Sequence, residues 1–206
     1  SIHLSRLAEE LVIWSSDSFD FVRLPEKFTT GSSIMPQKRN PDAAELIRAK
    51  PGRIFGNLLS LMTVLKGLPM TYGKDMQEDK EPIFDTSRNI ELCIFNMDGM
   101  IKEIEPIPEK MMEALQRGHP TATDLADYLV VNLKIPFRDA HRLTGELVLL
   151  SEKKMHSLEN LTLEDIQNVI PNAESSILEV LKVKNSVSSR TSYGGTAPKN
   201  VLKAIK

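Results

Sequence analysis

The chain has 206 residues, of which 41% are hydrophobic and 26% charged, and this balance excludes a disordered, collagen-like or low-complexity protein. The net charge of −2 gives no electrostatic support for nucleic-acid binding, and no apolar run approaches the ~18 residues of a membrane span. We therefore expect neither nucleic acid nor a membrane as a partner. Ten Gly and few aromatic residues argue against an all-β protein, whereas abundant Met, Leu, Glu and Lys favour helices.

The start of the chain and its single cysteine indicate whether it is part of a longer chain and in which compartment it is found. The chain opens on Ser1 without Met, with helical apolar spacing already under way and no recognisable signal peptide. We expect it to be part of a longer chain that is cut inside an element. A lone Cys93 excludes an internal disulfide and is typical of a reducing compartment, so we expect a cytoplasmic protein.

Three long segments in the first half carry apolar residues at steps of 3, 4 or 7, which predicts near-parallel packed helices. These residues are Leu4, Leu7, Leu11 and Trp14; then Ile47, Ile54, Leu58, Leu61 and Leu65; then Ile90, Ile94, Met97, Ile101 and Ile104. We interpret all three stripes as bundle core. Cys93, which lies on the third of these helices, is interpreted as buried packing as well. Pro51 and Gly52 predict a break or kink in the second helix, because proline removes one backbone hydrogen bond.

Two stretches between these helices are irregular by pattern. Residues 24–42 contain three prolines and a glycine and predict a long loop, of the kind that often binds a ligand. Residues 67–80 form a second loop that leads into a helix near Pro82.

Shorter helical segments follow in the second half. Pro136 is suited to open one of them, and Thr162 to Asp165 resembles a capping box for another. No strand alternation or internal repeat is recognisable. We therefore predict an all-α protein, with a long-helix bundle over residues 1–112 and a small helical domain over residues 113–206.

The loop from Gly31 to Pro41 gathers two hydroxyls, two cations and the Asn40 amide before a predicted helix start. Cations, an amide and a helix N-terminus together suit an anion such as a carboxylate. By composition alone, a solvated surface turn is the more common explanation of such a segment, because serine and lysine are frequent in loops.

The same loop resembles the signature of the fumarase/aspartase superfamily, Gly-Ser-Ser-x-Met-Pro-x-Lys-x-Asn. All seven specified positions match, namely Gly31, Ser32, Ser33, Met35, Pro36, Lys38 and Asn40. This pattern identifies the superfamily and leaves the substrate open.

The segments around the loop resemble argininosuccinate lyases. They are Gln37, Asn40–Asp42, Glu45–Arg48, Leu65–Pro69, Thr71–Tyr72, Lys74–Asp75, Gln77–Glu81, Ala122–Ala126, Pro136–His141 and Gly194–Ala197. The resemblance covers essentially the whole chain and corresponds to the C-terminal half of that family. It implies an all-helical homotetramer whose active sites each draw on three subunits. It also implies reversible cleavage of argininosuccinate to arginine and fumarate in arginine biosynthesis, with no metal or organic cofactor.

The resemblance also assigns roles to individual residues. It makes Ser32 the catalytic base and Glu45 the acid that orients the family's catalytic histidine. It assigns substrate binding to five positions, namely Lys38, Asn40, Tyr72, Gln77 and Lys80.

The family's general acid lies in a His-Thr or Thr-His sequence, and no such pair occurs here. We interpret His3, His119, His141 and His156 as structural or surface residues, and we expect the 206-residue chain alone to be inactive. Three alternatives remain open: a sister lyase such as adenylosuccinate lyase or fumarase, a non-catalytic crystallin-like protein, and a helical assembly module. The stretch containing Tyr72, Gln77 and Lys80 argues against the sister lyases.

Overall fold

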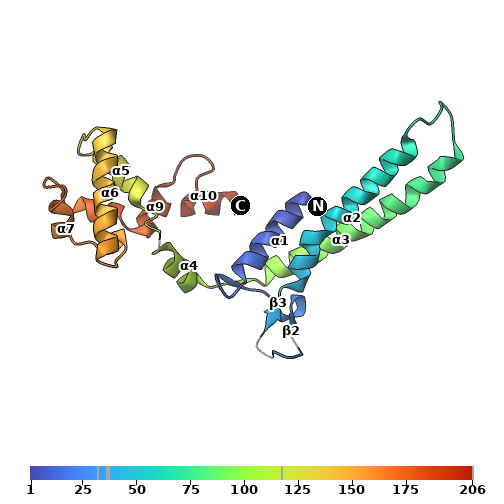
Figure 1. Ribbon diagram of the computed structural model, residues 1–206, viewed down its shortest axis with the longest axis horizontal. Helices are drawn as coiled ribbons and strands as arrows, with labels where there is room; N and C mark the ends of the chain where they lie inside the picture. The colour runs from blue at the N-terminus through green and yellow to red at the C-terminus, as the bar shows by residue number, and fades with distance from the viewer. Residues whose placement is uncertain (32, 36–37, 117, 206) are drawn as a thin grey trace. The chain divides into compact units, whose positions relative to one another are not determined.

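A computed structural model describes residues 1–31, 33–35, 38–116 and 118–205. The chain divides into two compact units, Ser1–Met111 and Met112–Lys206. Long helices dominate the first unit and shorter helices the second (Figure 1). The predicted all-α class is confirmed.

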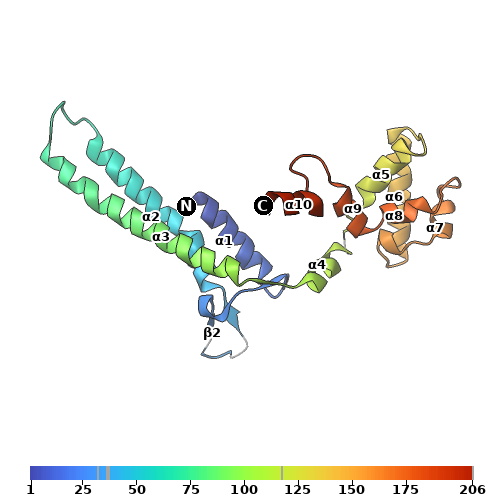
Figure 2. The ribbon, with the colours of Figure 1, turned by 180° about the vertical axis from the view of Figure 1, so that it is seen from behind.

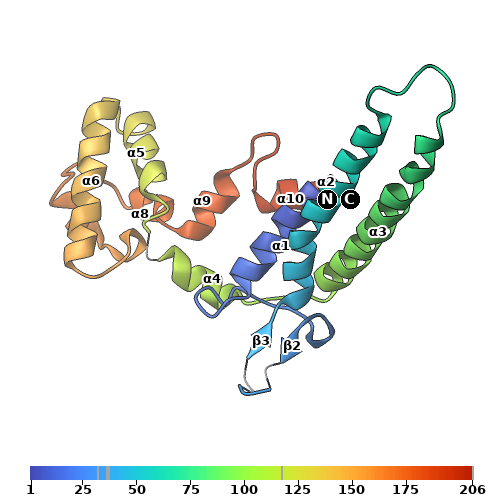
Figure 3. The ribbon, with the colours of Figure 1, turned by 45° about the vertical axis from the view of Figure 1, so that its right-hand side comes forward.

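The first unit is built on three helices, α1 (Ile2–Trp14), α2 (Asp42–Leu65) and α3 (Lys80–Lys102). Helices α2 and α3 form a long antiparallel hairpin, and α1 packs beside its lower half (Figures 1 and 3). The buried core of this unit consists of Ala8, Leu11, Ala44, Ile47, Cys93, Met97 and Met100. The core therefore lies at the end of the hairpin that α1 covers.

The apolar stripes predicted as core are only partly buried. Leu11, Ile47 and Met97 are buried, whereas Leu58 is 52% exposed and Ile94 is 54% exposed. Beyond the reach of α1, one side of α2 carries a row of exposed apolar side chains at helical spacing. We call Phe55, Leu58, Leu59 and Met62 the apolar α2 surface.

The predicted break in the second helix does not occur, and the kink at Pro51 stays a prediction. Helix α2 continues through Pro51 and Gly52 for 24 residues. A proline inside a helix costs about 3 kcal/mol, mostly through one lost hydrogen bond and a local clash. The hydrogen bonds and packing of both flanking halves are sufficient to keep the helix whole.

Four two-residue strands, which the sequence did not reveal, lie in the described part of this unit. Strand β1 (Val22–Arg23) pairs antiparallel with β4 (Glu105–Pro106). The segment that follows α3 therefore lies beside the segment that follows α1. Strand β2 (Thr30–Gly31) pairs antiparallel with β3 (Arg39–Asn40). The predicted long loop is therefore a short hairpin preceded by a 3-10 turn, η1 (Glu26–Phe28).

The second unit is a group of helices, most of them short, and α4 (Pro108–Leu115) crosses the boundary between the units (Figure 2). The remaining elements are α5 (Ala122–Val131), α6 (Phe137–Lys153), η3 (Leu158–Asn160), α7 (Leu163–Gln167), α8 (Ser176–Val180), α9 (Val183–Ser189) and α10 (Pro198–Ile205). Leu125, Leu129, Leu147 and Ile177 lie at the centre of its buried core. In the described ranges, no helix combines the length and the apolar character needed to cross a bilayer.

The predicted capping box at Thr162 is confirmed. The Thr162 hydroxyl accepts a hydrogen bond from the Asp165 amide at 3.2 Å, and the Asp165 carboxylate accepts one from the Thr162 amide at 3.2 Å. Two backbone donors at the start of α7 are thereby satisfied.

Candidate functional site

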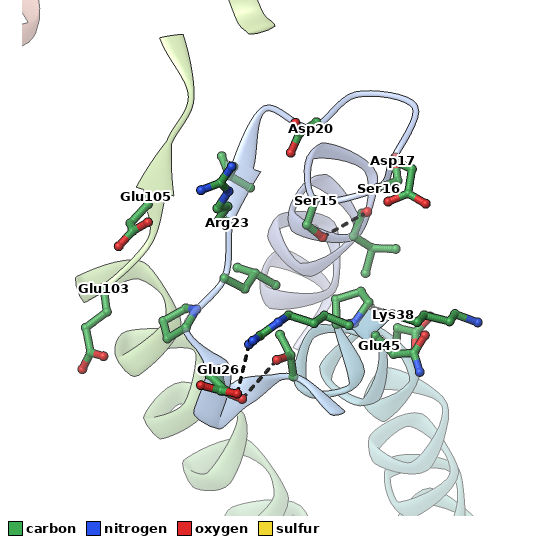
Figure 4. Close-up of a pocket in the computed structure, with 18 of the residues that line it drawn as sticks. Ser15, Ser16, Asp17, Asp20, Arg23, Glu26, Lys38, Glu45, Glu103 and Glu105 are labelled. Carbon is green, nitrogen blue, oxygen red and sulfur yellow. Dashed lines mark hydrogen bonds and ion pairs between the residues drawn. The ribbon is translucent and has the colours of Figure 1, made fainter. Parts of the chain in front are cut away.

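A cavity of about 1290 Å³ lies in the first unit, where the end of α1, strand β3 and the start of α2 meet the chain that follows α3 (Figure 4). Among the described residues that line it, six are acidic and three are basic. The acidic ones are Asp17, Asp20, Glu26, Glu45, Glu103 and Glu105, and the basic ones are Arg23, Lys38 and Arg39. A cavity with both charges suits a small molecule that carries both carboxylates and cationic groups.

The short hairpin β2–β3 brings two predicted residues to this cavity. Thr30 lies opposite Asn40 in the strand register, and the Lys38 amide donates a hydrogen bond to the Met35 carbonyl at 3.0 Å. Lys38 thus enters the cavity just before β3, and Asn40 enters at its end. The predicted base, Ser32, lies outside the described residues.

The segment before the hairpin is fixed to α3. Gly99 of α3 makes room for the ring of Phe28, because a Cβ on Gly99 would lie 2.4 Å from that ring. The Lys27 ammonium pairs with Glu103 at 2.5 Å. The Arg39 guanidinium pairs with Glu26 at 3.2 Å, so the second strand is tied to the same turn (Figure 4).

Glu45 lies in the first turn of α2 and lines the same cavity as Lys38 and Asn40. Its carboxylate is 3.8 Å from the Arg48 guanidinium, which makes a shorter contact of 2.8 Å with Glu9 of α1. Figure 4 shows Lys38 and Glu45 at one side of the cavity and two further glutamates at the other. Three of the predicted residues therefore share one cavity.

The end of α1 contributes a polar wall that the sequence analysis missed. Ser15, Ser16, Asp17 and Asp20 line the cavity there, and both serine hydroxyls donate to carbonyls of the helix itself, at 2.7 and 2.6 Å. The polar run that follows Trp14 is the only sequence signal that could have indicated this wall. Across the ranges that the structure describes, no three His, Cys, Asp or Glu side chains could jointly hold a metal ion.

The other predicted binding residues lie far from this cavity. Tyr72 is 74% exposed in the segment between α2 and α3, Gln77 lies in the 3-10 turn η2 (Lys74–Asp79), and Lys80 begins α3. The Lys80 ammonium contacts Asp79 at 2.6 Å. Helix α2 separates them from the cavity, and 24 residues at a rise of ~1.5 Å span about 36 Å. One copy of the chain does not bring the two sets together.

No histidine lines the cavity within the described ranges. His119 belongs to the second unit, where its ring lies 3.9 Å from the Glu152 carboxylate. Burial raises the pKa of the Cys93 thiol, which lies in the core between α2 and α3.

Comparison with known proteins shows what the chain is similar to. A family profile described as "Argininosuccinate lyase C-terminal" matches residues 119–188, and one described as "Lyase" matches residues 1–56. Argininosuccinate lyase 1 of Mesorhizobium japonicum is 56% identical over 99% of this chain, and the argininosuccinate lyase of Ehrlichia chaffeensis is 54% identical over 100% of it. Over essentially its whole length, the chain is similar to argininosuccinate lyases. It spans 44% of the length of each of these two relatives.

Solved structures of the wider superfamily share the fold. An EDDS lyase in complex with formate matches 98% of this chain, and the chain covers 42% of that structure, with 27% identity and a TM-score of 0.77. A class II fumarase from Schistosoma mansoni matches 87% of the chain and is covered to 35%, with 20% identity and a TM-score of 0.59. The second likeness concerns the fold alone.

Proposed function

We propose that this chain is the part of an argininosuccinate lyase that carries the signature loop, acting on argininosuccinate to give arginine and fumarate. The observation that carries the proposal is an identity of 54–56% with argininosuccinate lyases over at least 99% of the chain. The cavity supports it, since Lys38 and Asn40 of the signature meet Glu45 there.

The proposed reaction is an elimination. Ser32, acting as an alkoxide, takes a proton from the carbon beside a carboxylate of the substrate, and the electron pair then expels the arginine nitrogen to leave fumarate. A serine is a weak base at its ordinary pKa, so nearby donors must stabilise the alkoxide. Neither a metal nor an organic cofactor is required by this step.

The carbanion formed in this way places its charge on the adjacent carboxylate. Positioned donors and cations around such a charge are the largest source of rate in comparable reactions. Lys38 and Asn40 supply a cation and an amide at the cavity, and Glu45 is placed to orient a histidine that this chain does not itself supply.

The second set of residues implies that complete sites form between copies. Because Tyr72, Gln77 and Lys80 lie about 36 Å from the cavity along α2, they serve substrate bound at another copy. The apolar α2 surface supports the predicted homotetramer, since exposed apolar rows of this kind bury themselves against a partner. In this proposal, residues 1–112 form part of a central bundle and residues 113–206 a small flanking domain.

The setting of the enzyme follows from its reaction. Production of arginine places it in arginine biosynthesis. A single buried cysteine is compatible with the reducing cytoplasm, where we propose that it acts.

A chimeric enzyme tests this function. The chain replaces the matching 204 residues of the Mesorhizobium japonicum relative, and release of fumarate from argininosuccinate and from adenylosuccinate is measured. We expect the chimera to cleave argininosuccinate and not adenylosuccinate, with a kcat for argininosuccinate within about tenfold of the unmodified relative. A tetrameric chimera that cleaves neither substrate would contradict the proposal and favour a structural protein, and cleavage of adenylosuccinate would favour a sister lyase.

A further inference from the structure

Polar side chains, rather than buried apolar ones, join α2 to α3 in the half of the hairpin that leads to the second loop. Among the described residues, those buried on α2 are Ala44 and Ile47, and those buried on α3 begin at Asn89 and continue away from the loop. Fully buried apolar side chains are therefore confined to the end that α1 covers, whereas Ile54, Leu61 and Val64 in the other half of α2 are only half-buried.

Asp85 of α3 is the centre of the polar contacts. The Arg53 guanidinium of α2 donates to it through two nitrogens, from Nε to Oδ2 at 2.7 Å and from Nη2 to Oδ1 at 2.5 Å. The Asn57 amide, one turn further along α2, donates to Oδ2 at 2.7 Å. These donors hold the pKa of Asp85 at about 2, so it is ionised at neutral pH.

Neighbouring residues extend the contacts in both directions along the helices. Asn57 also donates to the Thr86 hydroxyl at 3.1 Å. Lys50 of α2 donates to the side-chain oxygen of Asn89 at 2.7 Å, and the Asn89 amide donates to the Asp85 carbonyl at 2.7 Å. Asn89 is only 6% exposed, so its polar atoms depend on these partners.

Such contacts select one alignment of two helices. A planar guanidinium that meets a carboxylate through two parallel hydrogen bonds loses both when either helix slides by one turn, about 5.4 Å. Apolar side chains tolerate such a slide far better, and single polar groups between helices are known to fix register. Lys80 lies five residues before Asp85 on the same helix, so any slide of α3 moves the second loop with it.

We propose that Asp85 is a positioning residue, whose contacts with Arg53 and Asn57 fix the register of α3 on α2 and thereby place Tyr72, Gln77 and Lys80 for argininosuccinate. The substrate part of this proposal rests on the proposed function. The register part concerns the chain alone.

The register is tested on the 206-residue chain by electron paramagnetic resonance. Spin labels at Ala49→Cys of α2 and Glu81→Cys of α3 report their separation, with excess unlabelled chain added to remove distances between copies. Cys93 is buried and its thiol pKa is raised, so the chain without added cysteines serves as the labelling control.

We expect one narrow distance for the parent chain and a distance shifted by up to ~5 Å, or clearly broadened, for Asp85→Leu. Asp85→Asn keeps the shape of the side chain and its contact with Asn57, and is expected to broaden the distance less. Asp98→Asn removes an ion pair with Lys102 within the same helix and is expected to change nothing. An unchanged distance in both Asp85 variants would overturn the register assignment.

Kinetics of the chimeric enzyme test the substrate part. Asp85→Leu is expected to raise KM for argininosuccinate about tenfold with kcat within about threefold, because binding by the second loop is lost while the base is untouched. Exchange of the partners, Arg53→Asp with Asp85→Arg, is expected to restore KM. A shifted distance with unchanged KM would overturn the positioning role. A parent chimera inactive on argininosuccinate would instead refute the proposed function, and the distances would still decide the register.

Discussion

The Thr30 hydroxyl donates a hydrogen bond to the Asp42 carboxylate, twelve residues further along the chain. Thr30 opens the short hairpin that carries the signature loop, and Asp42 opens helix α2. This contact closes the base of the hairpin against the helix. It thereby sets where Lys38 and Asn40 enter the cavity.

Removal of the Thr30 hydroxyl is expected to loosen the hairpin. In Thr30→Val we expect trypsin to cut after Lys38 or Arg39 about fivefold faster, since one exposed hydrogen bond contributes about 1 kcal/mol. Thr30→Ser retains the hydroxyl and the parent rate. Thr63→Val removes a hydroxyl from α2 that donates to the Leu59 carbonyl of the same helix, and serves as the control. Equal cleavage of all four chains would show that the contact does not hold the hairpin.

Acid is expected to weaken the first unit through Asp85. The pKa of Asp85 is about 2 in the folded chain against an ordinary value of 3.8, so ionised Asp85 stabilises the folded state above about pH 4. This stabilisation falls as the pH drops from about 4 to about 2. The single tryptophan, Trp14, reports unfolding of this unit in urea. The difference in unfolding free energy between the parent and Asp85→Asn is expected to shrink over that range, and a constant difference would contradict the pKa shift.

Loss of the proposed base is expected to act on turnover. In the chimeric enzyme, Ser32→Ala should lower kcat by ~10²–10⁴-fold with little change in KM, because the hydroxyl acts on the proton in the transition state. Ser33→Ala changes the neighbouring hydroxyl and is expected to retain most of the activity. A near-normal kcat in Ser32→Ala would exclude it as the base.

The second loop is expected to select the substrate. Gln77→Ala and Lys80→Ala should each lower kcat/KM for argininosuccinate about tenfold or more, since each leaves a polar group of the bound substrate without its partner, at ~1–3 kcal/mol. Glu78→Ala changes an exposed neighbour in the same turn and serves as the control. Wild-type kcat/KM in both variants would reject the role, and loss of the tetramer would indicate a structural one instead.

Self-association is expected to depend on the apolar α2 surface. The parent chain should sediment as an oligomer at micromolar concentration, and Leu59→Glu with Met62→Glu should shift it toward monomer, because both side chains are exposed in one copy. Leu149→Glu alters a similarly exposed leucine of α6 in the second unit and is expected to leave the oligomer intact. A stable parent monomer would contradict this expectation.

Local signals in the sequence predicted local structure well. The apolar stripes located the three long helices, and Thr162 with Asp165 located the start of α7, because each depends on residues within a few positions. The two strand pairs escaped prediction because each strand has two residues, too few to show alternation. The break expected at Pro51 failed because propensity at one residue is outweighed by packing along 24.

The candidate site was predictable only in part. Lys38, Asn40 and Glu45 lie close together in sequence, and they share the cavity. The wall contributed by Asp17 and Asp20 arises from chain reversal after α1, which short-range patterns do not encode. The distance between the two loops is set by the unbroken length of α2. Because the sequence predicted an interruption at Pro51, it did not predict this distance.

That unbroken length makes α2 a spacer between two binding elements. A loop of similar size could lose or gain residues while its two ends stay in the same positions. In a helix, each residue adds a fixed ~1.5 Å to the distance between the two ends. Removing seven residues from α2 would keep every remaining side chain close to its original face and still shorten the spacer by about 10 Å. Exposed side chains of α2 can therefore be exchanged during evolution, whereas the number of residues in the helix is constrained.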